Sequence, residues 1–315
     1  MKIVAGDAAT LGTDLDLSHL NALGDVEIHA LTAPHEIASR FHGADVAIVN
    51  KLRMNRDTLG EHPTLSLIAE CATGFDNIDL NYCREKGIAV ANVKGYSTHS
   101  VAQVTLSMAL FFATNLADFR TCVASGDYTA VGIANRLTPV FHELCGKTWG
   151  IVGAGNIGGQ VARVAQAMGC HVIGFSRTKK ENIEQVSLDE LCWRADVISI
   201  HLPLSGQTRG IIGEREIAMM KKNVILINVA RGAITDEKAL ADAVLRGHIG
   251  GLGVDVYSTE PFPEEHPFTA IRNHPRVCFT PHMAWGAKEA RERCLAEVAQ
   301  NIKAFLSGER RNRID

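Results

Sequence analysis

The sequence lacks the patterns that mark disulfide-stabilised, metal-binding or nucleic-acid-binding proteins. Its 8 cysteines are scattered, with no Cys-x-x-Cys pair and no secretory leader, which favours reduced thiols in a cytoplasmic protein. It contains no His-Glu-x-x-His motif and no Cys/His cluster, so no metal site is expected. A net charge of -3 provides no basic field, which argues against nucleic acid and anionic membranes as partners.

Convincing membrane spans are also missing. The apolar stretch of residues 101–119 predicts a long, largely buried helix instead, because it contains Gln103, Thr105, Ser107, Thr114, Asn115 and Asp118. The chain has 315 residues, of which 46% are hydrophobic, and this is enough for about two domains with cores of their own.

Short apolar runs alternate with segments of helical spacing along the chain, and such alternation predicts parallel sheets covered by helices. The expected strands of the first third are 2–5, 26–30, 46–49, 65–70 and 88–91, with helices at 34–41, 56–61 and 80–86. After residue 119 the expected strands are 148–152, 172–175, 197–200, 224–227, 250–254 and 277–279, with helices at 157–168, 187–194, 213–220 and 236–246. Six strands with crossovers match a dinucleotide-binding fold, and an amphipathic helix at 288–306 is expected to return to the first domain.

A glycine-rich motif, Gly153-Ala154-Gly155-Asn156-Ile157-Gly158, follows the run 148–152 and opens a helical segment. Gly153 would allow a tight turn, Gly155 the close approach of a pyrophosphate, and Gly158 close packing of the helix on the strand. The N-terminus of that helix offers free N–H groups to an anion. A glycine turn without a ligand is the alternative, but the strand–turn–helix context favours a dinucleotide site.

The end of the next strand departs from the usual pattern for NAD. A carboxylate is expected about 20 residues after the glycines, where it binds the ribose hydroxyls. Here Ser176 takes that place, followed by Arg177, Thr178 and two lysines. A guanidinium can bind a 2′-phosphate that a carboxylate would repel, so NADP(H) is favoured and NAD(H) remains possible. A solvated basic loop is the alternative interpretation.

Three ionisable residues each follow an apolar run in the last third of the chain: Arg231, Glu260 and His282. Residues just beyond the carboxyl ends of parallel strands line the ligand crevice of an open α/β sheet. The three side chains are therefore expected to meet there as an anion clamp, a group that tunes a proton donor, and the donor itself. Taken singly, each has the alternative of a surface ion pair or a structural histidine.

Several motifs occur together in the right order: residues 71–79 (CATGFDNID), the glycines at 153–158, and the runs 228–232, 255–261 and 280–285. On these residues the chain resembles the D-isomer-specific 2-hydroxyacid dehydrogenases over nearly its whole length. Residues 95–97 and 280–285 are most similar to the glyoxylate/hydroxypyruvate reductase (glycerate dehydrogenase) group. The resemblance implies two doubly wound parallel-sheet α/β domains. A flavodoxin-like substrate domain would comprise 1–97 plus 288–315, and a Rossmann cofactor domain 98–287.

The resemblance implies a role for each site residue. His282 would be the acid/base of 2-oxo acid reduction, Glu260 would hold the imidazole ring and favour imidazolium, and Arg231 would grip the substrate carboxylate. Substrate would also contact Thr73, Gly74 and Trp285. The expected cofactor-binding set is Gly153, Gly155, Asn156, Ile157, Gly158, Ser176, Arg177, Thr178, His201, Pro203, Thr105, Ala230 and Asp255. A purely structural role is the alternative for His201 and Asp255.

Three other functions are known on similar scaffolds or sites. Formate dehydrogenases place a glutamine where Glu260 stands, and phosphoglycerate dehydrogenases commonly carry a further regulatory domain. A small unphosphorylated 2-oxo acid such as glyoxylate or hydroxypyruvate is therefore the expected substrate. The alternative from another class is a dinucleotide-sensing, corepressor-like binding protein with little turnover. The apolar helix predicted after Ser100 leads to the expectation of a homodimer.

Overall fold

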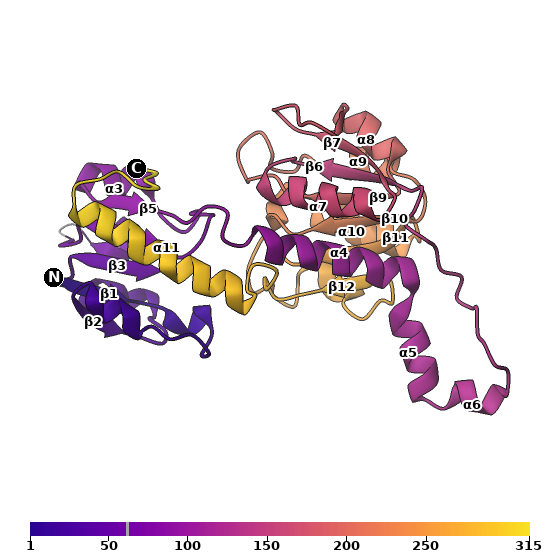
Figure 1. The fold of residues 1–315 in the computed structure, drawn as a ribbon, viewed down its shortest axis with the longest axis horizontal. Helices are drawn as coiled ribbons and strands as arrows, with labels where there is room; N and C mark the ends of the chain where they lie inside the picture. Colours follow the sequence, from indigo (N-terminus) through magenta and orange to yellow (C-terminus); the bar gives the residue numbers. More distant parts are fainter. Residues whose placement is uncertain (61–62) are drawn as a thin grey trace. The chain divides into compact units, whose positions relative to one another are not determined.

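The computed structural model describes residues 1–60 and 63–315, and its contacts divide them into two units. The first unit comprises Met1–Ser97 and Trp285–Asp315, and the second comprises Thr98–Ala284 (Figure 1). The return to the first unit therefore lies just before Trp285, three residues earlier than the predicted boundary at 287/288.

The first unit is built on a five-stranded parallel sheet with the order β2-β1-β3-β4-β5. This is the flavodoxin-like order, which has a switch point between β1 and β3. Four of its strands, β1, β3, β4 and β5, are mostly apolar because helices bury both faces, whereas the edge strand β2 is half charged and largely exposed. They span Lys2–Ala5 (β1), Asp25–Ile28 (β2), Val46–Val49 (β3), Leu67–Glu70 (β4) and Ala89–Ala91 (β5).

One face of this sheet packs against α11 (Lys288–Leu306), which contributes Cys294, Leu295 and Val298 to the core. The other face is covered by η3 (Pro34–Glu36), α1 (Ile37–Arg40), α2 (Arg56–Leu59) and α3 (Leu80–Lys86). The short helices η1 (Ala8–Leu11) and η2 (Ser18–Ala22) complete the unit. The helix predicted at 56–61 is shorter in the structure, and Glu61 lies outside the described residues.

The second unit contains a seven-stranded parallel sheet with the order β12-β11-β10-β9-β6-β7-β8, which is the Rossmann order with one added strand. Its strands span Thr148–Val152 (β6), His171–Phe175 (β7), Glu184–Gln185 (β8), Val197–Ile200 (β9), Val224–Asn228 (β10), Ile249–Val254 (β11) and Val277–Phe279 (β12). The prediction missed β8 because this edge strand has only two residues, both polar and exposed.

Helices cover both faces of this sheet (Figure 1). On one face α4 (Thr98–Thr114) packs beside α7 (Asn156–Ala167). A Cβ on Gly251 would lie 2.4 Å from Phe112, and one on Gly253 would lie 2.9 Å from Met108, so these glycines let α4 approach β11. The opposite face holds α8 (Leu188–Arg194), α9 (Glu214–Met219) and α10 (Glu237–Leu245), with η4 (Gly232–Ile234) and η5 (Pro267–Ile271).

The single buried helix predicted at 101–119 is broken in the structure. Asn115 adopts a left-handed conformation with φ 48°, and beyond it run α5 (Leu116–Ala124) and α6 (Asp127–Val131). Leu116 and Val123 are each 63% exposed, and Cys122 is the one buried residue of α5, so most of the predicted burial lies in α4. Among the described residues no single helix is long and apolar enough to cross a membrane; α4 and α5 reach that length only together, with a 64° bend between them.

Candidate active site at the strand ends of the second unit

The strand order explains why Arg231, Glu260 and His282 share one edge of the sheet. Each follows one of three adjacent parallel strands, β10, β11 and β12. The register aligns Asn228 with Val254 and Val254 with Phe279, so the three strands end level. The sequence prediction that these residues gather at one sheet edge is consistent with this topology.

His282 and Glu260 are in direct contact. The Nδ1 atom of His282 lies 2.6 Å from Oε2 of Glu260, and both side chains are partly exposed, at 23% and 34%. The other oxygen, Oε1, accepts the backbone N–H of Tyr257 at 2.9 Å. With Nδ1 occupied by the carboxylate, Nε2 is the ring nitrogen left for a ligand.

Asp255 organises the loop that carries His282. It is 1% exposed, and its carboxylate accepts the Thr280 hydroxyl at 2.6 Å. It also accepts the backbone N–H groups of Met283 and Ala284, each at 2.9 Å. Burial raises the pKa of this carboxyl, and these hydrogen bonds oppose that effect. The structural alternative for Asp255 is therefore well supported, and cofactor contact stays a prediction.

The bonds from Asp255 flank His282 on both sides and hold it at φ 51°, a left-handed conformation that histidine tolerates better than most residues. This restraining role of Asp255 was not predicted from the sequence. The available signal was its place directly after an apolar strand, where a buried acid needs several donors.

Asn228 shapes the turn before Arg231 in a similar way. It is fully buried, its Nδ2 donates to the carbonyl of Arg231 at 2.9 Å, and its Oδ1 accepts the N–H of Ala230 at 3.1 Å. The guanidinium of Arg231 donates through Nη1 to the Ala230 carbonyl at 2.8 Å. A polar residue at the end of an apolar strand, as Asn228 is, was the sequence signal for this second missed residue.

The glycine motif has the geometry of a phosphate-binding turn. Gly153 has φ +100°, and a Cβ there would lie 2.9 Å from the backbone of His201. A Cβ on Gly158 would lie 2.2 Å from the Gly153 carbonyl, so α7 can begin this close to β6 only with glycine. Gly155 is the N-cap of α7 with open space around it, and Asn156 and Ile157 form the first turn. The motif therefore fits a dinucleotide pyrophosphate.

The segment that replaces the usual carboxylate lies just beyond β7. The hydroxyl of Ser176 donates to the carbonyl of Thr178 at 2.7 Å, and the amide of Gln185 donates to the carbonyl of Ser176. Arg177 and Thr178 are exposed. The loop thus has a defined turn that presents a guanidinium to solvent.

Three further residues of the predicted cofactor-binding set, His201, Pro203 and Thr105, differ in their exposure to solvent. Burial lowers the pKa of His201 to about 3, and Nε2 contacts the Ser199 hydroxyl at 2.9 Å, so this ring is neutral. Pro203 is exposed beyond β9 and accepts the Thr208 hydroxyl at 2.7 Å. Thr105 is fully buried in α4 and donates to the Val101 carbonyl at 2.8 Å. Their contacts with a cofactor stay predictions.

The remaining predicted substrate residues belong to the first unit. The hydroxyl of Thr73 donates to the Val93 carbonyl at 2.7 Å, and its own carbonyl accepts from Asn92 at 2.7 Å. These bonds fix the turn, while the backbone N–H groups of Thr73 and Gly74 donate to no acceptor within the described residues. Elsewhere in this unit Trp285 contacts Tyr96 edge-on, with ring centroids 6.3 Å apart.

Lys51 places its ammonium 5.7 Å from the Trp285 ring centre. The loop that carries Lys51 is held by Asp7, a buried carboxyl whose Oδ2 accepts the Lys51 N–H at 2.6 Å. Across residues 1–60 and 63–315 there is no cluster of three or more His, Cys, Asp or Glu side chains suited to a metal ion.

A Rossmann sheet, a glycine turn at a helix N-terminus and a carboxylate–histidine pair at the strand ends define a nicotinamide-dinucleotide-dependent oxidoreductase. Residues 106–284 match the family model described as "D-isomer specific 2-hydroxyacid dehydrogenase, NAD binding domain". The chain belongs to the D-isomer specific 2-hydroxyacid dehydrogenase family, as its motifs predicted, and it is an enzyme of that class.

Known proteins resemble the chain over nearly its full length. A hydroxypyruvate reductase of Blautia hydrogenotrophica is 35% identical and is aligned over 98% of both chains. Among solved structures, D-lactate dehydrogenase from Aquifex aeolicus with NAD and lactic acid is 29% identical, with a TM-score of 0.85 over 98% of this chain and 96% of that one.

An acyclic imino acid reductase solved with NADPH and D-Arg is 27% identical, with a TM-score of 0.88 over 100% of both chains. Relatives of this fold thus bind either nicotinamide dinucleotide. The comparisons give no support to the corepressor-like alternative.

Proposed function

We propose that the chain reduces a small 2-oxo acid reversibly to the D-2-hydroxy acid, with His282 as the acid and base. The observation that carries this proposal is the 2.6 Å contact between His282 Nδ1 and Glu260 Oε2 at the ends of adjacent strands. A histidine held this way by a carboxylate suits proton transfer near neutral pH. When bound, the nicotinamide supplies or accepts the hydride.

In the direction of reduction, His282 donates the proton on Nε2 to the substrate carbonyl oxygen. Glu260 stabilises the imidazolium before transfer and keeps the ring oriented. Arg231 binds the substrate carboxylate and polarises the carbonyl. In the direction of oxidation, neutral His282 accepts the hydroxyl proton.

We propose an unphosphorylated substrate of the size of glyoxylate or hydroxypyruvate. The 35% identity to a hydroxypyruvate reductase, in an alignment that covers 98% of the chain, supports this class. The test is the rate of NAD(P)H oxidation with glyoxylate, hydroxypyruvate, pyruvate and longer 2-oxo acids. We expect the highest kcat/KM for one of the first two; turnover of none of these acids by a protein that binds cofactor would overturn the proposal.

We also propose that NADP(H) is the preferred cofactor. Ser176 supplies no carboxylate to repel a 2′-phosphate, and Arg177 is exposed, so that its guanidinium can bind such a phosphate. The hydrogen bond from the Ser176 hydroxyl to the Thr178 carbonyl fixes the backbone turn that carries Arg177.

Replacing Arg177 with alanine should lower the ratio of kcat/KM for NADPH to that for NADH by roughly 10- to 100-fold, because a charge-assisted hydrogen bond is lost. Ser176→Asp should lower the ratio too, by restoring the carboxylate. Arg272→Ala, which removes an exposed arginine paired with Glu264, is the matched control. A wild-type enzyme that strongly prefers NADH would contradict the assignment.

A homodimer is proposed from the apolar surface of α4–α6 and the segment after them. This surface comprises Leu110, Leu116, Val123, Val131, Ile133, Leu137, Val140 and Phe141, all at least 38% exposed. So many exposed apolar side chains in one stretch favour a protein partner, and a second copy is the simplest one. The 8 free cysteines agree with a reducing compartment, and we propose the cytoplasm.

Light scattering should give twice the chain mass for the wild-type protein. Val123→Glu should shift it toward the monomer, because a charge would be buried in the interface. Leu245→Glu alters a leucine that is 58% exposed elsewhere in the second unit and should leave the mass unchanged. A monomeric wild-type protein at micromolar concentration would refute this proposal.

A further inference from the structure

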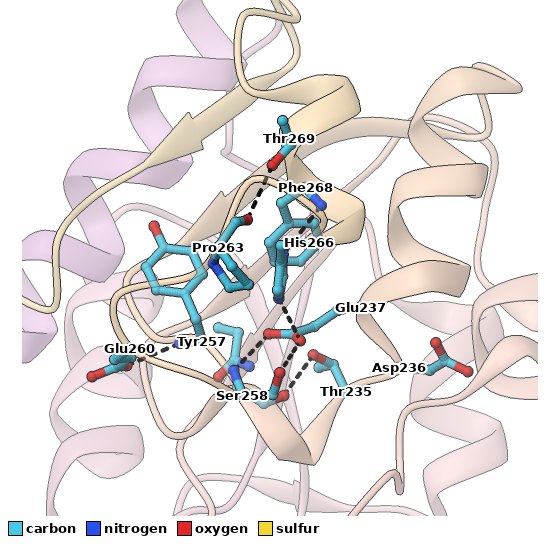
Figure 2. A network of polar contacts seen from close by, with 12 residues as sticks. Thr235, Asp236, Glu237, Tyr257, Ser258, Glu260, Pro263, His266, Phe268 and Thr269 are labelled. Carbon is cyan, nitrogen blue, oxygen red and sulfur yellow. Dashed lines mark hydrogen bonds and ion pairs between the residues drawn. The ribbon is translucent and has the colours of Figure 1, made fainter.

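A buried carboxylate, Glu237, lies behind the loop that carries Glu260. It is the first residue of α10 and is only 9% exposed. Its Oε1 accepts the backbone N–H of Ser258 at 2.8 Å. Its Oε2 accepts the hydroxyl of Ser258, and it also accepts the Nε2–H of His266, the latter at 2.9 Å. Figure 2 shows these donors converging on Glu237, while the neighbouring Asp236 points away.

The environment of His266 determines which ring nitrogen carries the hydrogen. Its Nδ1 accepts the backbone N–H of Phe268 at 3.2 Å, so the hydrogen is on Nε2 and is directed at Glu237. The imidazole ring is 8% exposed and packs near Phe262 and Phe268, at centroid distances of 4.9 and 5.0 Å. Glu237 is therefore paired with a ring that the aromatic core holds in place.

Consecutive peptide groups join this buried acid to the active site. The N–H of Ser258 goes to Glu237, and the N–H of Tyr257 goes to Glu260 at 2.9 Å. The Tyr257 hydroxyl donates to the Thr280 carbonyl at 2.9 Å, two residues before His282. Tyr257 thus contacts both loops of the carboxylate–histidine pair.

The same peptide also packs against the loop of Arg231. A Cβ on Gly232 would lie 2.0 Å from the carbonyl carbon of Tyr257 and 2.2 Å from the nitrogen of Ser258. The Tyr257–Ser258 peptide is therefore hydrogen-bonded to Glu237 and packed closely against Gly232, where even a Cβ has no room.

From this arrangement we propose that Glu237, together with His266, is a positioning group for the reaction. It holds the Tyr257–Ser258 peptide and thereby keeps Glu260 directed at His282. The inference deepens the proposed function and rests on the roles given there to Glu260 and His282. Glu237 itself is buried, touches no substrate, and acts only through the loop.

The effect should appear in the pH dependence of reduction. Glu260 lies within hydrogen-bond distance of Nδ1 of His282, and a carboxylate in that position favours a protonated imidazole, so we expect a looser contact to move the alkaline limb of kcat/KM to lower pH. Other charged and titratable groups lie near this pair. Asp255 interacts with His282, Cys278 interacts with Asp255, Tyr257 interacts with Asp255, Glu260 and Glu237, and Arg231 lies at the neighbouring strand end. Comparison with Glu260→Gln therefore decides how much of a shift comes from the Glu260–His282 contact.

The experiment compares Glu237→Gln with the wild-type enzyme over a range of pH. We expect kcat/KM for the 2-oxo acid to fall roughly tenfold on the alkaline side, with its alkaline limb moved to lower pH. Affinity for NAD(P)H should change less than about twofold, because the glycine turn is untouched. Ser258→Ala, which removes a single hydroxyl, should give a smaller shift in the same direction and carries the test if Glu237→Gln does not fold.

Glu216→Gln is the matched control. Glu216 is also 9% exposed, lies in the first turn of α9 and accepts the Gly213 N–H at 3.0 Å, but it has no contact with the Glu260 loop. The Glu216→Gln variant should lower the melting temperature about as much as Glu237→Gln does and leave the pH profile unchanged. An equal shift of the profile in both variants would show that Glu237 contributes only to stability, and would overturn the inference.

A double-mutant cycle with Glu260→Gln separates this inference from the proposed function. If Glu237 acts through Glu260, adding Glu237→Gln to Glu260→Gln should move the alkaline limb no further. If Glu260→Gln by itself leaves the alkaline limb of the pH profile unchanged, the proposed role of Glu260 is overturned. If Glu260→Gln moves the limb and Glu237→Gln does not, the proposed function stands and the positioning role of Glu237 falls.

Discussion

Replacing His282 with alanine should lower kcat for reduction by roughly 10³-fold, while the protein stays folded and binds NAD(P)H as before. A positioned acid or base contributes about 10² to 10⁴ in rate, and alanine leaves the carbonyl oxygen without a proton donor. The measurement is steady-state turnover with saturating cofactor, together with a cofactor titration of the variant. The alkaline limb of the pH profile should disappear with the imidazole.

The control uses the other end of the same strand. His274 lies just before β12, where its Nδ1 accepts the backbone N–H of Arg276 at 3.2 Å, whereas His282 lies just after β12. His274→Ala should leave turnover within about twofold of wild type because it is remote from the strand ends. Near-normal turnover of folded His282→Ala would remove the acid/base assignment.

The second large effect concerns Arg231. Its replacement with alanine should lower kcat/KM for the 2-oxo acid by roughly 10²- to 10³-fold, since a charge-assisted clamp on the carboxylate is lost along with its orienting effect. Arg231→Lys should recover only part of the loss, because an ammonium cannot form the paired hydrogen bonds of a guanidinium. Steady-state kinetics with both substrates varied would measure each change.

Cofactor affinity distinguishes this role from general damage. The glycine turn joins β6 to α7, whereas Arg231 follows β10. The Arg231→Ala variant should therefore bind NAD(P)H nearly as well as the wild-type enzyme. Arg276→Ala is a suitable control, since Arg276 precedes β12 at the opposite sheet edge. Equal losses of cofactor and substrate affinity would contradict the assigned role.

The sheets could be predicted because most of their strands are apolar on both faces, as in β3 and β9, where every residue is buried. The same signal fails for β8, whose two residues, Glu184 and Gln185, pair only with the edge of β7. It also failed at Asn115, because nothing local distinguishes an asparagine that ends a helix in the left-handed region from one inside it.

The candidate site was predictable to the extent that it follows from strand ends. Glu260 and His282 each come shortly after a strand, so topology alone brings them near each other. The support behind them was not predictable: Glu237 and His266 are 29 residues apart, and their contact depends on how α10 meets the loop after β11. The local sequence around Glu237 reads only as the start of a helix.

The bonds of Asp255 to both sides of His282 bear on how this chemistry could be transferred to another scaffold. A design that copies only the histidine and its carboxylate would leave the ring on a loop free to relax from its left-handed backbone. Asp255 supplies that restraint from inside the protein, out of reach of substrate. A transplanted site would need this acid, buried at the end of the neighbouring strand, before its histidine could work.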